Sequence, residues 1–252
     1  RNLSGFTVED LRGAPDVARA RLSGGEDGRG SVAKFNEPKD LAVDPDTGDV
    51  WVADTQNHKL RRVTPSGEVT SIGSTREGDF GYADGSASEA RFDSPRSICY
   101  DRLRRAMVVG EEDNGSLRSV SLADHTVDRL AGDLRQGERD GPARQAEFNS
   151  PTSIVQDGRT GNLYIADATA DELAEFDQHA VRVLSPGGEV TTLCGSTHAG
   201  RRDGAGARAR LDRPGRLLVD AEARALIVVD QGSGALRRVD LGSGQVTTLT
   251  WW

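Results

Sequence analysis

The chain has 252 residues and a formal net charge of −8, with 29% charged and 5% aromatic residues. Nucleic-acid-binding proteins usually carry a basic footprint, so this charge balance argues against a nucleic acid as the partner. The longest apolar runs are only a few residues long, far short of the roughly 20 that a membrane-spanning helix needs. We therefore expect neither a nucleic-acid partner nor a membrane span.

The first predicted element is a strand at residues 7–13, TVEDLRG. It matches the block that closes each later repeat, with Val8 and Leu11 at the positions of Val69 and Ile72. A linker that ends in DGRGSVAKF follows it, and similar DG segments precede the later repeats at 84–92, 140–148 and 203–211. The chain therefore begins with what resembles the last strand of a repeat.

Four tandem repeats follow, at approximately 35–73, 92–132, 148–195 and 211–250. Each opens with a proline and an aspartate six residues later, as in PKDLAVD and PRSICYD, and closes with a block such as GEVTSIG. Short runs of Val, Leu, Ile and Thr between Gly, Asp, Asn and Pro are typical of antiparallel strands and tight turns. Four such strands per repeat predict a single all-β domain over residues 1–252, a β-propeller of four-stranded blades.

The strand at 7–13 is surplus to four complete blades. A ring that closes by pairing its first and last strands needs a final blade without its own outer strand, but residues 245–250 supply one. We expect the four blades to be part of a ring of about five or six blades, or to be closed by another chain. A compact four-bladed ring with a redundant strand is the alternative.

The second block of the first repeat, VADTQNHKLRRV at 52–63, resembles the NHL-repeat family, with Asn57, His58 and Leu60 at the namesake positions. The DG…ARF…P and GEVTTL pieces are also typical of that family, and the resemblance covers nearly the whole chain. The namesake triplet is degenerate in the other three repeats. The resemblance implies a propeller used mostly to bind other macromolecules, with a minority of enzymes on related propellers.

An acidic residue recurs seven positions before an arginine in three repeats, and across an eight-residue insertion in the third repeat. The pairs are Asp54–Arg61, Glu111–Arg118, Asp230–Arg237 and Asp167–Arg182. Such a pair can form a charge-assisted hydrogen bond across the turn between two strands. Because it occurs in all four repeats, we interpret it as an architectural clasp. A second set of aspartates predicts turns: Asp44, Asp101, Asp157 and Asp220.

The sequence predicts no catalytic, metal or cofactor site. The four histidines fall at three different repeat positions, whereas a catalytic zinc site needs about three converging ligands. The two cysteines, Cys99 and Cys194, give no metal framework, suggest no disulfide and leave the compartment open. The predicted starts of the inner strands form a mixed polar rim without an acid–base pair: Lys39, Asp40, Arg96, Ser97, Thr152, Ser153, Gly215 and Arg216.

Two charged loops interrupt the repeats, and such interruptions often carry function. The insertion at 167–178, DATADELAEFDQ, holds five acids, and the linker at 198–216 is rich in arginine. Both are expected on the same face of a propeller, where they could meet. Two aromatic residues end the chain. The candidate partner-binding residues are Asp171, Glu172, Leu173, Glu175, Phe176, Asp177, Arg201, Arg202, Arg208, Arg210, Trp251 and Trp252.

The leading interpretation is a non-catalytic protein-interaction or scaffold module, a subunit or domain of a larger assembly with a protein partner. It predicts that all five acids of 167–178 can be replaced without loss of folding. The charged loops could instead be solvated or paired internally, and the two tryptophans could cover the edge of the last blade. The main functional alternative is a propeller hydrolase or lyase with a metal at the channel mouth; an RNA-binding propeller is a third interpretation.

Overall fold

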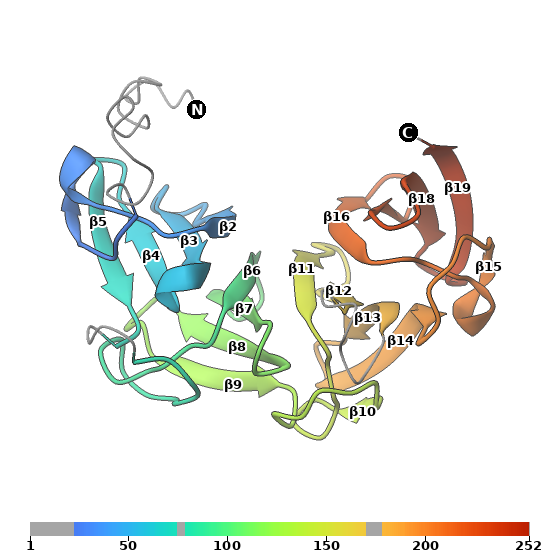
Figure 1. The fold of residues 1–252 in the computed structure, drawn as a ribbon, viewed down its shortest axis with the longest axis horizontal. Coiled ribbons are helices and arrows are strands. Elements are labelled where there is room, and N and C mark those ends of the chain that lie inside the picture. The colour runs from blue at the N-terminus through green and yellow to red at the C-terminus, as the bar shows by residue number, and fades with distance from the viewer. Residues whose placement is uncertain (1–22, 75–78, 170–177, 252) are drawn as a thin grey trace.

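The computed structural model describes residues 23–74, 79–169 and 178–251. Four antiparallel sheets stand side by side in an arc, with the first described residues at one end of that arc and the last at the other (Figure 1). The innermost strand of each sheet begins at the predicted proline: β2 (Pro38–Val43), β6 (Pro95–Asp101), β11 (Pro151–Gln156) and β16 (Pro214–Asp220). The predicted all-β propeller fold is confirmed. The strand predicted at 7–13 lies outside the described residues.

Each sheet is one blade, and its strands run outward from the inner strand in chain order. Blade 1 continues with β3 (Val50–Asp54), β4 (Lys59–Val63) and β5 (Glu68–Ile72). Blade 2 continues with β7 (Ala106–Glu111), β8 (Ser116–Ser121) and β9 (Val127–Ala131). Blade 3 continues with β12 (Leu163–Ala168), β13 (His179–Leu184) and β14 (Glu189–Ser196). Blade 4 continues with β17 (Ala225–Asp230), β18 (Ala235–Asp240) and β19 (Gln245–Trp251).

Three blades also contain a short fifth strand that the sequence did not predict. The linkers before blades 1, 3 and 4 pair with the outer strand of the blade that they lead into, through β1 (Gly28–Arg29), β10 (Gly141–Pro142) and β15 (Gly204–Ala205). In blade 2, Gly85 makes an isolated bridge to Val127 at the same place. Glycine is required at this position because φ lies between 137° and 153° in all four blades. Each linker therefore pairs with the outer strand of the blade that follows it, a contact that we call the clip.

The remaining short elements are 3-10 helices and turns. The helices are η2 (Gly30–Val32), η3 (Thr55–Asn57) and η4 (Gly206–Arg208). The predicted turn aspartates act as expected: the Asp44 carboxylate accepts hydrogen bonds from the Asp46 amide (2.9 Å) and the Thr47 hydroxyl (2.8 Å). Asp157 accepts the equivalent bonds in blade 3.

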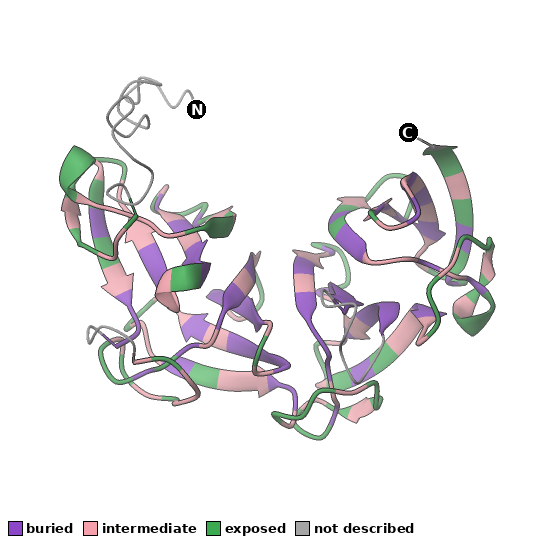
Figure 2. Ribbon diagram, in the orientation of Figure 1, coloured by how far each residue is buried: buried purple, intermediate pink, exposed green. Residues whose placement is uncertain are grey.

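The hydrophobic core consists of three clusters, one between each pair of neighbouring blades. Trp51 and Phe92 lie between blades 1 and 2, Phe148 and Ile165 between blades 2 and 3, and Leu211 and Val228 between blades 3 and 4. Figure 2 shows buried segments in the middle strands and exposed segments along the outer edges. The apolar core therefore lies between stacked blades and not within a single blade. Among the described residues, no helix is long and apolar enough to cross a membrane.

Candidate functional site

One arginine side chain per blade is fully buried: Arg61, Arg118, Arg182 and Arg237. Each donates through Nη1 to the predicted acidic partner, at 2.9 Å (Asp54), 3.2 Å (Glu111), 3.1 Å (Asp167) and 2.8 Å (Asp230). In blades 1 to 3 the guanidinium also lies over the phenylalanine that precedes the inner strand, at 4.9 to 5.3 Å from its centroid. The predicted clasp is confirmed in all four blades.

A second carboxylate completes each clasp, and it belongs to the aspartate of the DG segment in the linker. The Nη2 atoms of the four arginines donate to Asp27, Asp84, Asp140 and Asp203 at 2.7 to 2.9 Å. Asp140 also accepts hydrogen bonds from the amide and hydroxyl of Thr192 on the outer strand. The clasp therefore joins the linker, the middle strands and the outer strand of one blade.

The sequence analysis missed these linker aspartates, although a signal was present. The DG aspartate precedes its arginine by 34 residues in blades 1, 2 and 4, and by 42 in blade 3, where the eight-residue insertion intervenes. A constant spacing of this kind identifies a repeated contact as clearly as the seven-residue spacing did.

The clasp carboxylates are suited to structure and not to proton transfer. Burial raises the pKa of Glu111, Asp167 and Asp230, and the neighbouring arginine opposes this effect. The Asp167 carboxylate is also bound by the amides of Asn149 and Ser150, each at 2.9 Å. A carboxylate enclosed by fixed donors is not available to a substrate. Because Asp167 is a clasp acid, we expect its replacement, unlike that of the other four acids of 167–178, to lower the free energy of unfolding.

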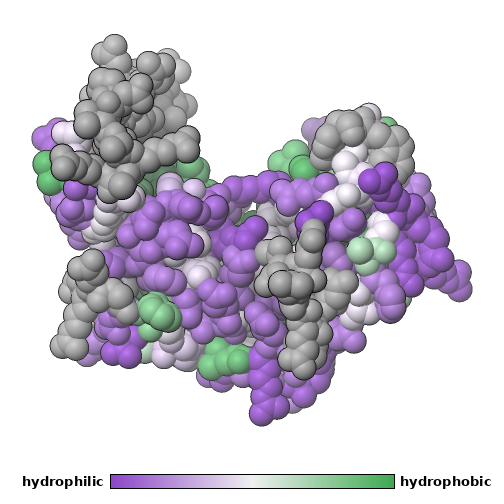
Figure 3. Space-filling model, in the orientation of Figure 1, coloured by the Kyte–Doolittle hydropathy of each residue, from purple (hydrophilic) through white to green (hydrophobic). Residues whose placement is uncertain are grey.

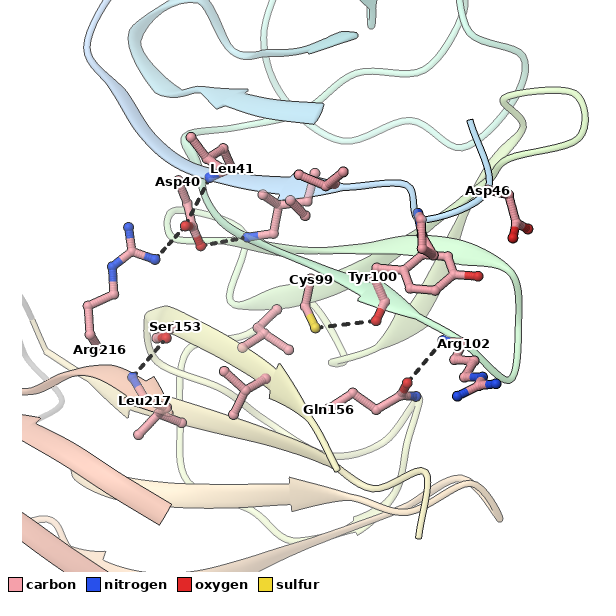
Figure 4. Close-up of a pocket in the computed structure, with 16 residues that line it drawn as sticks. Asp40, Leu41, Asp46, Cys99, Tyr100, Arg102, Ser153, Gln156, Arg216 and Leu217 are labelled. Carbon is pink, nitrogen blue, oxygen red and sulfur yellow. Dashed lines mark hydrogen bonds and ion pairs between the residues drawn. The ribbon is translucent and has the colours of Figure 1, made fainter. Parts of the chain in front are cut away.

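The inner strands line an open pocket of about 760 Å³ (Figure 4). At one end Arg216 of blade 4 donates hydrogen bonds to the Asp40 carboxylate and the Lys39 carbonyl of blade 1. This ion pair connects the first and last inner strands across the arc. At the other end the pocket is lined by Asp46, Arg102 and Gln156.

Several polar groups of this pocket are held by the protein itself. Asp40 also accepts hydrogen bonds from the backbone amides of Leu41 (2.9 Å) and Ile98 (3.1 Å). Burial raises the pKa of the Cys99 thiol to about 12, so it does not provide a thiolate nucleophile near neutral pH. Within residues 23–74, 79–169 and 178–251, no three His, Cys, Asp or Glu side chains cluster as a metal site requires.

We call the side of the arc that carries the inter-blade linkers and the turns between the second and third strands the linker face. On this face, the Thr169 amide donates a hydrogen bond to the Gln178 carbonyl at 2.9 Å. These two residues flank the blade 3 insertion, and we call them its neck. Next to this neck, the Arg213 amide donates to Nδ1 of His179 at 2.9 Å. The neck of the insertion therefore contacts the arginine-rich linker at 198–216 (the arginine linker), as His58 contacts Ser94 between blades 1 and 2. That the two charged loops meet stays a prediction.

Three of the four candidate arginines in the arginine linker are exposed: Arg201, Arg202 and Arg208. The fourth, Arg210, is half-buried and donates to the Ser196 hydroxyl beside the neck. Arg202 and Arg210 form a β-bridge, and Arg202 Nε donates to the Arg208 carbonyl at 2.7 Å. These bonds hold the loop in shape and leave charged groups at the surface.

Among the other candidates, Trp251 is the last residue of β19, with its backbone paired to Ala235. The remaining ones lie outside the described residues: Asp171, Glu172, Leu173, Glu175, Phe176, Asp177 and Trp252. Their role as partner-binding residues stays a prediction.

The structure adds one surface residue that the sequence did not single out. Phe80 lies in the linker before blade 2, is 56% exposed and stacks on the His58 ring at a centroid distance of 4.8 Å. His58 Nδ1 accepts a hydrogen bond from the Ser94 amide and lies 3.1 Å from the Asp93 carboxylate. Phe80 has no repeated counterpart, and its exposure depends on packing. The view in Figure 3 is mostly hydrophilic, with isolated hydrophobic residues.

Comparisons with known proteins agree with the fold and the repeat. The NHL repeat family matches residues 35–62. The chain is an NHL-repeat β-propeller. It is 24% identical over 231 residues to Protein SUPPRESSOR OF QUENCHING 1, chloroplastic, of Arabidopsis thaliana, covering 89% of this chain and 21% of that protein. It is 26% identical over 229 residues to NHL repeat-containing protein 2 of Homo sapiens, covering 84% and 31%.

Two solved structures illustrate the range of proteins that share this fold. A protein of unknown function from Bacteroides thetaiotaomicron superposes with a TM-score of 0.63 at 20% identity, over 81% of this chain and 47% of that one. A gluconolactonase from Xanthomonas campestris superposes with a TM-score of 0.59 at 16% identity, over 84% and 61%. These likenesses establish the fold alone. The chain spans 20% to 41% of the length of the curated relatives that it matches.

Proposed function

We propose that this chain is a non-catalytic protein-interaction module that binds a protein partner through its linker face. The observation that carries this proposal is the exposure of Arg201, Arg202 and Arg208 on a loop that its own backbone and side-chain bonds hold in shape. The His179–Arg213 contact fixes the base of this loop, as the His58–Ser94 contact does between blades 1 and 2. We propose that the acidic residues at 171–177 lie beside the arginine linker and form a bipolar surface with it.

The arginine linker has the chemistry of a recognition surface. Arginine is enriched at the energetic centres of protein interfaces, because its planar guanidinium forms paired hydrogen bonds to carboxylates. Arg201, Arg202 and Arg208 are exposed on a loop whose backbone is held by a β-bridge and by η4. Since the loop is ordered before binding, less conformational entropy is lost when a partner docks.

The non-catalytic part of the proposal is supported by the state of the polar groups in the pocket and the clasps. Asp40 is committed to Arg216 and to two backbone amides, and the clasp acids are committed to buried arginines. Asp40 and the clasp acids are therefore not positioned to accept a proton from a substrate.

A charge-reversal experiment tests the proposal. We expect R201E/R208E to reduce the recovery of co-purifying proteins by at least about tenfold, because the two introduced glutamates would repel the partner carboxylates that the arginines attract. The matched control is R159E/R224E, which changes two arginines of the first-to-second-strand turns, at the other ends of the strands. Recovery is measured by quantitative affinity capture from the native source, and folding by thermal unfolding.

Two results would contradict the proposal. One is equal recovery of the same proteins by wild type, R201E/R208E and the control. The other is metal-dependent turnover of an ester or lactone by the purified chain that is abolished by changing residues of the pocket, such as Asp40. That second result would favour the propeller hydrolase or lyase.

A further inference from the structure

The end of the pocket formed by the first-to-second-strand turns, which we call the turn end, departs from the repeat. The residue before the turn aspartate is Val43 in blade 1 and Val219 in blade 4, but Tyr100 in blade 2 and Gln156 in blade 3. The residue after that aspartate is Arg102 in blade 2, whereas the other blades have proline, glycine and alanine there. A phenol, an amide and a guanidinium are therefore gathered where the repeat otherwise places small or apolar residues.

Gln156 holds the turn of blade 2 in place from the inner strand of blade 3. Its Oε1 atom accepts a hydrogen bond from the Arg102 amide at 2.9 Å, and its Nε2 atom donates to the Asp101 carboxylate at 2.7 Å. Asp101 is fully buried and also accepts hydrogen bonds from the amides of Leu103 and Arg104. The backbone that carries Arg102 is therefore fixed before a ligand binds, which lowers the entropic cost of binding.

Two polar groups at the turn end are not used by the described part of the chain. No hydrogen bond or ion pair from residues 23–74, 79–169 or 178–251 engages the Arg102 guanidinium or the Tyr100 hydroxyl. Asp46 lines the same end, but its carboxylate is paired with Arg105 at 2.8 Å. Figure 4 shows Tyr100, Arg102 and Asp46 together at this end, away from Arg216. The uncompensated charge at the turn end is therefore positive.

Between its two polar ends the pocket has an apolar wall. Leu41 and Val43 on β2 are 61% and 50% exposed, and half-buried Val155 on β11 also lines the pocket. At the opposite end the Asp40 carboxylate is already bound by Arg216 and by two amides. The volume of about 760 Å³ lies within the range of small-molecule sites. The pocket thus offers one free cation at one end of an exposed aliphatic wall.

We propose that this pocket binds a small amphipathic carboxylate. The carboxylate accepts hydrogen bonds from the Arg102 guanidinium and the Tyr100 hydroxyl, and the apolar body of the ligand lies against Leu41, Val43 and Val155. A planar guanidinium matches a carboxylate in a bidentate pair, and one free cation offsets one negative charge. The proposal rejects a phosphate dianion, for which the turn end supplies too few cations, and an amine, which Arg102 would repel.

A series of probe ligands tests the proposal on the full natural chain. Isothermal titration calorimetry compares octanoate with hexanoate, octanamide, octylamine and octyl phosphate. We expect octanoate to bind at least about tenfold more tightly than octanamide, because the amide forms no charge-assisted bond with Arg102. Each methylene added from hexanoate to octanoate should tighten binding by about threefold, because it covers more of the aliphatic wall.

Four results with the natural chain would overturn the proposal. They are no binding of octanoate, equal binding of octanoate and octanamide, and tighter binding of either octylamine or octyl phosphate. The site lies at the opposite ends of the strands from the arginine linker, so these results leave the proposed partner surface untouched. Loss of partner capture in R201E/R208E would likewise leave octanoate binding unchanged.

Two variants locate the carboxylate of the ligand. Arg102→Met removes the charge and keeps much of the aliphatic length, and we expect it to weaken octanoate binding by about tenfold and octanamide binding by less than about twofold. Tyr100→Phe should weaken octanoate binding by about threefold. The matched control is Arg159→Met, which changes an exposed arginine on the turn of blade 3 that does not line the pocket.

The control should bind octanoate as the natural chain does. Equal weakening by Arg102→Met and Arg159→Met would indicate a general attraction of anions to a basic surface, and would contradict a site at Arg102. Thermal unfolding shows whether each variant is folded. The probe series on the natural chain remains decisive if a variant does not fold.

Discussion

The buried clasp arginines and the exposed residues of the arginine linker are the same residue type in opposite environments. Arg237 is fully buried between Asp230 and Asp203, while Arg208 stands exposed on the linker that leads into the same blade. The buried arginine has a counterpart in every blade, whereas the position of Arg208 holds an arginine in the fourth linker alone. The comparison indicates that repetition marks structure in this fold, and that departures from the repeat are where a partner can be recognised.

The largest expected effect comes from breaking a clasp. Arg182→Leu leaves two carboxylates without their cation, one of them fully buried, and we expect a loss of about 3–5 kcal/mol in the free energy of unfolding. Arg208→Leu, at the exposed position, should change it by less than about 0.5 kcal/mol. Urea unfolding followed by circular dichroism measures both.

A double variant sharpens this result. Arg182→Leu combined with Asp167→Leu removes the buried charge together with its partner, so part of the lost stability should return. If the double variant is as unstable as the sum of the two single variants, then the packing of the guanidinium on Phe148 matters more than its charge.

A smaller effect is expected from the linker carboxylate. The Asp140 side chain is 45% exposed, and it binds Arg182 and the outer strand. Because solvent can replace some of these bonds, we expect Asp140→Ala to cost about 1–2 kcal/mol, less than the loss of Arg182. The control is Asp128→Ala, an exposed acid on β9. Equal costs for Asp140→Ala and Arg182→Leu would remove the distinction between the buried and linker halves of the clasp.

The smallest effect concerns pH. His125 lies edge-on to Trp51 at 5.4 Å, and burial together with nearby Arg62 lowers the pKa of its imidazole. Well above pH 6.5 the imidazole is neutral in both the folded and the unfolded chain and contributes nothing. As the pH falls through the unfolded pKa, the unfolded chain binds the proton more readily, so the fold loses some stability, and the loss is complete below the folded pKa.

His125→Asn should remove this part of the acid-side decline, because asparagine tolerates the φ of 60° at this position. The measurement is the difference in unfolding free energy between wild type and variant from pH 7.5 to 5. A difference that does not change with pH would show that His125 titrates alike in both states.

Much of the fold was predictable because a repeat reveals its own geometry. The acid seven residues before an arginine located three ion pairs correctly, and alignment across the insertion located the fourth, since both residues of each pair lie on adjacent paired strands. The DG aspartates were predictable in principle from their constant spacing, but they act between a linker and a strand, where no local pattern indicates the contact.

The surface was less predictable. Nothing in the sequence distinguishes exposed Leu41 from buried Ile98, because both occupy the same repeat position. Their difference depends on whether a neighbouring sheet is present. The exposure of Phe80 likewise depends on the path of a linker that has no repeated counterpart. Sequence periodicity therefore predicts contacts within a blade better than the surroundings of that blade.

The clip between each linker and the outer strand has a consequence for how the chain folds during synthesis. The Asp27–Ser71, Asp140–Thr192 and Asp203–Thr248 bonds each join residues only 44 to 52 positions apart. A blade can therefore complete its own bonds soon after its outer strand leaves the ribosome, before the next blade exists. Pulling the chain from its ends should then release it in steps of one blade, whereas a single release of the whole arc would show that stacking between blades dominates.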